Sequence, residues 1–167
     1  MTPDLSRAVY SGNLSDSQTA DVIWADGSFR TAWVSASREE EEGGFRWCVA
    51  SFDVLGELMT APRCNLIGSA YAAGTAYNVR LASSGDGGLG LLATATQYLD
   101  HGFPLLFLRT DLRGTAVSSP VLLASLESDP GYAMGAFAIA WTDSRFAVLW
   151  YPMWSRELVI QLLEPAS

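Results

Sequence analysis

The chain has 167 residues, of which 49% are hydrophobic and 17% charged, a composition that fits one folded domain with a substantial core. Its formal charge of −8 argues against binding to nucleic acid, because contact with phosphate backbones requires clustered Lys and Arg. No signal-peptide pattern opens the sequence, and the longest apolar runs, such as residues 146–151, are too short to span a bilayer. We therefore expect a cytoplasmic protein that does not contact a membrane, or a secreted one if a signal peptide has been removed.

The first predicted elements are four short strands. β-favouring runs at residues 21–25 and 29–35 flank Asp26-Gly27, a dipeptide whose tolerance of positive φ suits a tight hairpin. A strand at 45–52, a turn at 53–56 and a weaker strand at 57–62 follow. The first third of the chain is therefore predicted to form antiparallel β-structure.

The remaining two thirds are also predicted to form short strands. The middle third has strands at 89–96 and 103–110 and, after a turn, at 115–123. The last third has strands at 137–142, 146–151 and 157–163. No segment keeps an apolar period of 3.6 residues, so we expect little helix.

Two motifs recur in the sequence at fixed internal spacing. W-x-D-x-x-F-x-x-x-W occupies residues 24–33 and again 141–150, and D-x-x-G-x-x-x-x-x-P occupies residues 53–62 and again 111–120. A decayed copy of the first motif lies at residues 86–93. The motifs predict one domain, 1–167, that contains three four-stranded repeats at about 14–66, 78–125 and 132–165.

The arrangement of an aromatic hairpin around Asp-Gly, then a strand that ends in Phe-Asp-x-x-Gly, resembles repeats of bacterial β-propeller proteins. The resemblance covers roughly residues 18–165 and concerns the fold, since neither the WD40 nor the kelch signature is present. It implies an all-β, propeller-like protein whose repeats are blades. Propellers include enzymes, lectins and scaffolds, so the resemblance implies no single activity.

Three repeats are fewer than the four to eight blades that usually close a propeller ring. The third repeat also lacks its outermost strand, while residues 5–11 precede the first repeat where the outer strand of a preceding blade would lie. We therefore expect half of a six-bladed ring, closed in a homodimer by exchange of the N-terminal strand 5–11. The alternatives are a piece of a longer propeller, a heteromer that supplies the missing blades, and a three-repeat fold that curls on itself.

Few residues point to catalysis or to a metal site. His101 is the only histidine and has no nucleophile motif beside it, and the acidic run at residues 39–42 has the character of a solvated loop. Cys48 and Cys64 lack metal-ligand spacing. We expect Cys48 to be a free, buried small hydrophobe, because a bridge to Cys64 would require export from the cytoplasm. No metal and no cofactor are expected.

Aromatic and arginine side chains in the connections between strands are the candidate ligand-binding residues. The tryptophans of the recurring motif are assigned to packing between blades. An aromatic side chain in a connection can instead stack on a sugar or anchor a protein partner, and a nearby arginine can bind an acidic ligand or pair with Asp143 or Glu157. The candidates are Tyr98, Tyr151, Trp154, Arg145 and Arg156.

These observations favour a non-enzymatic binding or scaffolding module that presents its loops to a protein or glycan partner. One alternative is a propeller-type hydrolase or lyase with carboxylates such as Asp86 or Asp143 in the central channel. Another is a structural subunit of a larger assembly. The sequence does not identify the ligand.

Overall fold

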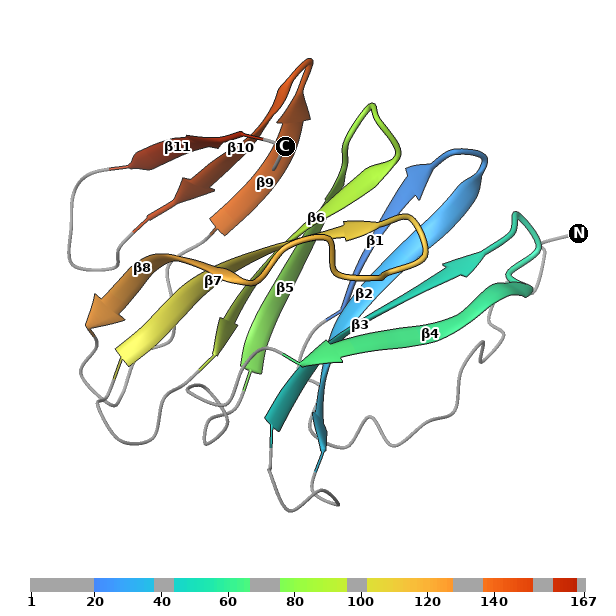
Figure 1. Ribbon diagram of the computed structural model, residues 1–167, viewed down its shortest axis with the longest axis horizontal. Coiled ribbons are helices and arrows are strands. Elements are labelled where there is room, and N and C mark those ends of the chain that lie inside the picture. Colours follow the sequence, from blue (N-terminus) through green and yellow to red (C-terminus); the bar gives the residue numbers. More distant parts are fainter. Residues whose placement is uncertain are drawn as a thin grey trace, which may run out of the picture.

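The fold is built from antiparallel β-sheets, as the computed structural model of the chain shows (Figure 1). The structure describes residues 20–37, 44–66, 76–95, 102–127, 137–151 and 158–164. Every regular element in these ranges is a strand, and the strands form two sheets of four and one of three. The expectation of an all-β protein is confirmed for this part of the chain.

The first sheet contains four strands in chain order, β1 to β4. Asp26 and Gly27 both have positive φ, 48° and 70°, which gives the β1–β2 hairpin the twist that flanking strands require. After β3, the Asp53 carboxylate accepts the backbone N–H groups of Leu55 and Glu57, each at 2.8 Å. The strands are β1 (Ala20–Ala25), β2 (Ser28–Ser37), β3 (Gly44–Phe52) and β4 (Leu58–Leu66).

The second sheet repeats this order with β5 to β8. Asp111 makes the same turn as Asp53, since its carboxylate accepts the N–H groups of Arg113 at 2.9 Å and Thr115 at 2.7 Å. The recurring D-x-x-G motif is therefore a turn whose aspartate caps the backbone. The strands are β5 (Ala76–Ser83), β6 (Gly88–Ala95), β7 (Gly102–Asp111) and β8 (Val121–Glu127).

The prediction of a strand at residues 115–123 is wrong in its start, because β8 begins only at Val121. Ala116 forms an isolated bridge to Thr110, and the chain then leaves the sheet. Pro120 has no N–H to donate to a ladder, so the strand starts directly after it. The first strand of this sheet, β5, had no corresponding prediction.

The third sheet has three strands in the order β9-β10-β11. A two-residue hairpin joins β9 to β10, with Thr142 opposite Arg145. The strands are β9 (Phe137–Thr142), β10 (Arg145–Trp150) and β11 (Val159–Leu163). The outermost strand that the first two sheets have is absent from the described part of this sheet.

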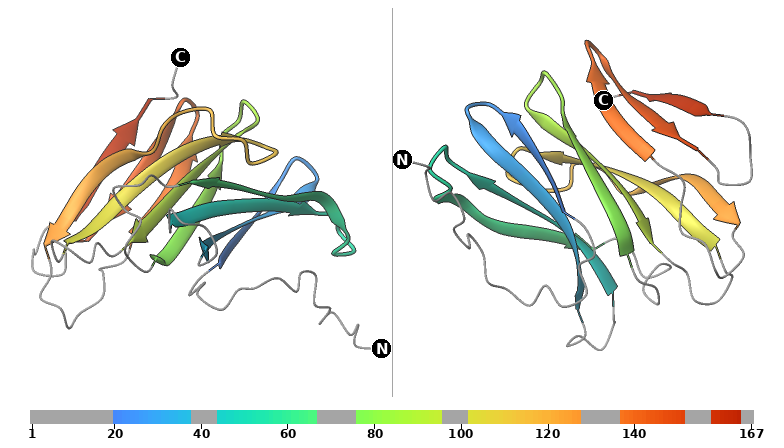
Figure 2. Two further views of the ribbon diagram at one scale, coloured as in Figure 1. Left: turned by 60° about the horizontal axis from the view of Figure 1, so that its bottom comes forward. Right: turned by 180° about the vertical axis from the view of Figure 1, so that it is seen from behind.

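The three sheets lie side by side in chain order and pack through their faces (Figures 1 and 2). The first strands of the sheets are neighbours, since β5 contacts both β1 and β9. We call the packed layer between the first and second sheets the first seam and the layer between the second and third sheets the second seam. Each seam contains one large cluster of buried apolar side chains.

Cys48 and Cys64 form a disulfide bond, so the expectation that Cys48 is a free hydrophobe is wrong. The two residues lie directly opposite each other in the register of β3 and β4, which brings their side chains to the same face of the sheet. Their separation of 16 residues in the sequence gives no hint of this pairing. Strand register, which depends on the position of the intervening turn and bulge, decides it.

Candidate functional site

The face of the first sheet that points away from the second sheet carries a row of large apolar side chains. Strand register aligns Trp24 with Phe29, Phe29 with Phe52 and Phe52 with Leu58. Trp24, Phe29 and Leu58 are 52%, 39% and 45% exposed. We call this surface the aromatic face, and it comprises Val22, Trp24, Phe29, Trp33, Phe52 and Leu58.

The third sheet carries the same motif in the same local geometry but in a buried setting. The rings of Trp141 and Phe146 meet edge to face with centroids 4.7 Å apart, and those of Trp24 and Phe29 do so at 4.9 Å. Phe146 is fully buried in the second seam, against the second sheet. In the first sheet, no described sheet covers the equivalent residues. The assignment of Trp24 to packing between repeats therefore fails within this part of the single chain.

At the second seam, Phe146 of the recurring motif packs against the second sheet at Gly90. The ring of Phe146 lies so close to Gly90 that an added Cβ would stand 2.6 Å from Cε1 of the ring. Ala82 and Leu92 are neighbours in the same cluster. The receiving surface is thus made from glycine, alanine and aliphatic side chains.

The outward face of the third sheet has a similar composition. Strand register aligns Ala140 with Ala147 and Ala147 with Leu162. Leu149 is paired with Ile160, which is 65% exposed, and Leu162 is 53% exposed. We call this surface the aliphatic face, and it comprises Ala138, Ala140, Ala147, Leu149, Ile160 and Leu162.

The outer edge of β11 is an unpaired strand edge in the described part of the chain. β11 stands third in its sheet, where β3 and β7 each pair with a fourth strand. β4, the outer strand of the first sheet, contains Pro62 next to a register shift, and such features discourage further pairing. β11 contains no proline and pairs with β10 without a register shift.

Two of the five candidate ligand-binding residues lie in the described ranges. Tyr151 directly follows β10 and is 39% exposed. The Arg145 guanidinium forms an exposed ion pair with Glu164 at 2.7 Å, a partner that was not predicted from the sequence, and Glu157 lies outside the described residues. The structure does not bring Tyr151 and Arg145 into a described pocket. Tyr98, Trp154 and Arg156 lie outside the described residues, as do His101 and residues 39–42 and 5–11.

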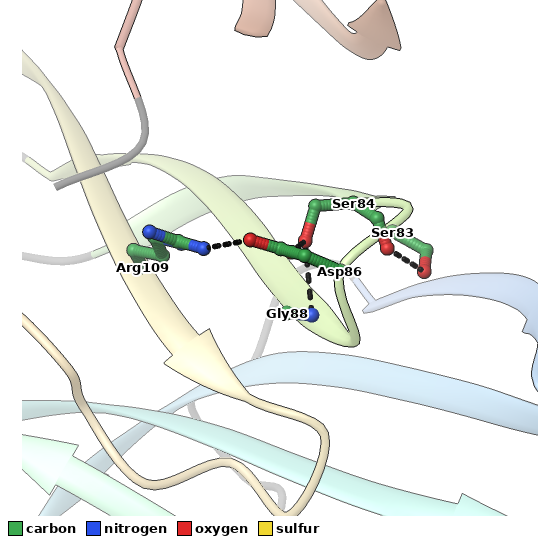
Figure 3. A network of polar contacts seen from close by, with 5 residues as sticks. All are labelled: Ser83, Ser84, Asp86, Gly88 and Arg109. Carbon is green, nitrogen blue, oxygen red and sulfur yellow. Dashed lines mark hydrogen bonds and ion pairs between the residues drawn. The ribbon is translucent and has the colours of Figure 1, made fainter. Parts of the chain in front are cut away.

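Asp86, a carboxylate considered for catalysis, holds the β5–β6 turn (Figure 3). Its carboxylate accepts a hydrogen bond from the Ser84 hydroxyl and pairs with Arg109 at 2.6 Å. The Ser84 hydroxyl accepts the N–H of Gly88 at 2.9 Å. The hydrogen bond from Ser84, together with the charge of Arg109, lowers the pKa of Asp86 from its ordinary value of 3.8. A carboxylate with a lowered pKa suits a turn anchor better than a proton donor at neutral pH.

Replacing Asp86 by Asn is expected to lower the free energy of unfolding by about 0.5 kcal/mol at pH 7, the scale of an exposed ion pair. Because folding lowers the pKa of Asp86, its contribution is present above pH 3.8 and is lost as the pH falls through the folded-state value. Urea unfolding of both proteins at pH 7 and pH 2.5 measures this. A difference that does not shrink as the pH falls from 7 to 2.5 would contradict the assignment.

Comparisons with known proteins found no relative whose function could be compared with that of this chain. The chain matches no family model, no curated protein and no solved structure. The described residues contain no group of three His, Cys, Asp or Glu side chains placed to hold a metal ion. In the same ranges, no helix has the length and apolar character needed to cross a membrane.

Proposed function

We propose that the chain is a non-enzymatic binding or scaffolding module, built as half of a six-bladed β-propeller. In this proposal each sheet is a blade, and two copies of the chain close the ring. The completed ring presents its inter-strand loops to a protein or glycan partner. Tyr151 directly follows β10, whereas Arg145 is the first residue of β10, at the opposite end of the strand.

The unequal exposure of one repeated motif carries the proposal. Trp141 and Phe146 have a sheet packed on them, whereas no sheet among the described residues covers Trp24 and Phe29, which have a similar edge-to-face ring geometry. Apolar rings exposed to this extent lose the stabilisation that burial gives, about 25 cal/mol for each Å² removed from water. A further blade packed on the aromatic face would recover it.

The aliphatic face of a second copy has the composition that the aromatic face requires. Its small and aliphatic side chains match those that receive Phe146 at the second seam, where Gly90 leaves room for the ring. In a two-fold dimer the aromatic face of each chain meets the aliphatic face of the other. The dimer then has two equivalent interfaces, each of which buries one aromatic face against one aliphatic face. Neither chain keeps an exposed apolar face to which a third chain could bind.

Exchange of the N-terminal strand would complete the third blade. In the described part of the chain β11 has an unpaired edge without proline or bulge, which is the kind of edge that accepts another strand. Residues 5–11 of the second copy, a segment outside the described residues, are the proposed fourth strand. The same dimer would therefore cover both the open faces and the open edge.

Light scattering on the purified full chain tests the proposal. We expect twice the 18.0 kDa mass of one chain. Trp24→Asp and Ile160→Arg should each shift the mass toward one chain, because each places a charge in the proposed interface. Leu55→Arg, at a turn residue that is 77% exposed and lies on neither face, is the control and should leave the mass unchanged.

Mixing the two interface variants distinguishes the proposed pairing from other dimers. A mixed dimer retains one unaltered pair of faces, so the dimer mass should partly return. A wild-type monomer would overturn the proposal. A dimer that Ile160→Arg leaves intact would contradict the pairing, since it would show that the aromatic face meets something other than the aliphatic face.

A further inference from the structure

Three arginines surround the turn that joins β7 to the loop before β8, at the edge of the first seam. The Arg30 guanidinium donates to the carbonyl of Leu112 at 3.0 Å, and that of Arg63 donates to the Thr115 hydroxyl at 2.6 Å. Arg113 is part of the turn itself and is exposed. Arg30 and Arg63 come from the first sheet, so the group exists only because the two sheets pack together.

The turn is held firmly against the first sheet. Asn65 of β4 donates to the carbonyl of Gly114 at 2.6 Å and accepts the N–H of Ala116 at 3.2 Å. Gly114 has φ 81°, and an added Cβ would stand 2.8 Å from Cβ of Val49. These contacts fix the position of Arg113 relative to β4.

In the described part of the chain, the three arginines bring three positive charges to a turn that carries one carboxylate, that of Asp111. None of their guanidinium groups forms an ion pair there. Asp111, in the same turn, uses its carboxylate oxygen to accept two backbone N–H groups. Arg30 is only 9% exposed, and its Nε has no hydrogen-bond partner. A buried cation with a single carbonyl partner is costly, and an anion nearby would lower that cost.

A depression of about 610 Å³ opens beside these groups. Its lining combines residues of β4 with Arg113 of the second sheet's turn: Thr60, Ala61, Pro62, Arg63, Cys64 and Arg113. The Thr60 hydroxyl lies 2.6 Å from that of Ser51, and strand register places Arg30 beside Ser51. The polar side chains of Arg30, Ser51 and Thr60 therefore form a row that leads from the buried arginine to the depression.

We infer that this depression binds a small molecule carrying a compact oxyanion, either a phosphate or a carboxylate group. The guanidinium groups of Arg63 and Arg113 offer paired donors that match the geometry of such oxygens, and Thr60 offers a hydroxyl. The buried Arg30 guanidinium adds a further positive charge near the bound oxyanion. The volume matches the range of metabolite-sized sites. This site lies at a seam within one chain, so it does not depend on the proposed dimer.

Calorimetric titration of the full chain at constant ionic strength tests the inference, with inorganic pyrophosphate and citrate as the two probes. We expect saturable binding of at least one, and the probe that binds identifies the oxyanion class. Arg113→Gln should weaken binding about tenfold, the scale of losing one hydrogen bond to a charged group. Arg63→Gln should act in the same direction.

Arg80→Gln is the matched control, because it removes an arginine of β5 that lies over the Phe137 ring at the second seam, away from the depression. It should leave the affinity unchanged. Circular dichroism melting curves check that each variant is folded. The inference is overturned if neither probe saturates, or if Arg113→Gln and Arg80→Gln weaken binding equally. A monomeric mass in solution would leave the inference standing, since both walls of the depression belong to one chain.

Discussion

Gly90→Ala is expected to lower the free energy of unfolding by about 1–3 kcal/mol, the cost of inserting a group into a packed core. The added Cβ would stand 2.6 Å and 2.8 Å from two carbon atoms of the Phe146 ring and 3.0 Å from Cδ1 of Ile139. Neither neighbour can move away easily, because Phe146 is fully buried in the second seam. The φ of Gly90 is not in the left-handed region, so backbone strain adds nothing to the effect.

A double-mutant cycle with Phe146→Ala isolates the cause. Phe146→Ala alone should lower stability by about 3–5 kcal/mol, because it leaves a cavity in the second seam. In that background Gly90→Ala should cost little, since the ring that it would strike is gone. Urea unfolding of the four proteins measures the coupling. Gly85→Ala is the control, because its added Cβ would meet only Nε1 of Trp141, at 3.4 Å. Strict additivity would contradict the close contact.

The sequence predicts those parts of the fold that depend on short-range chemistry. The Asp26-Gly27 hairpin and the two D-x-x-G turns need particular residues at particular φ values, so a repeated motif reports a repeated turn. The strands on both sides of the Asp26-Gly27 hairpin and the strand before each D-x-x-G turn are accordingly predicted to within a few residues. β5 escaped prediction because it carries neither motif, and residues 115–120 have strand-like composition although the chain there leaves the sheet.

The candidate surfaces depend on contacts between distant segments, which the sequence pattern does not reveal. Trp24 and Trp141 occupy the same place in the motif, and only the sheet order shows that one is covered and the other exposed. The arginine group is a further example, because 82 residues separate Arg30 from its partner Leu112. Alternation along β10 and β11 is the one signal that could have indicated the aliphatic face.

Removing the Cys48–Cys64 bridge is expected to lower the free energy of unfolding by about 3 kcal/mol, because an unfolded chain without the closed loop gains conformational entropy. The bridge closes a loop of 16 residues that contains the β3–β4 turn. Urea unfolding with and without dithiothreitol measures the loss. A Cys48→Ala, Cys64→Ala double variant should have the stability of the reduced protein.

Two further observations make this prediction specific. Dithiothreitol should have no effect on the double variant, because the variant has no bond to reduce. Titration of the denatured, unreduced wild type with a thiol reagent should find no free thiol, and two free thiols per chain would contradict the bridge. Disulfides persist mainly in oxidising compartments, so the same titration on protein taken directly from its source cells also tests the expectation of a cytoplasmic location. A bridge present there would favour export, and free thiols would favour the cytoplasm.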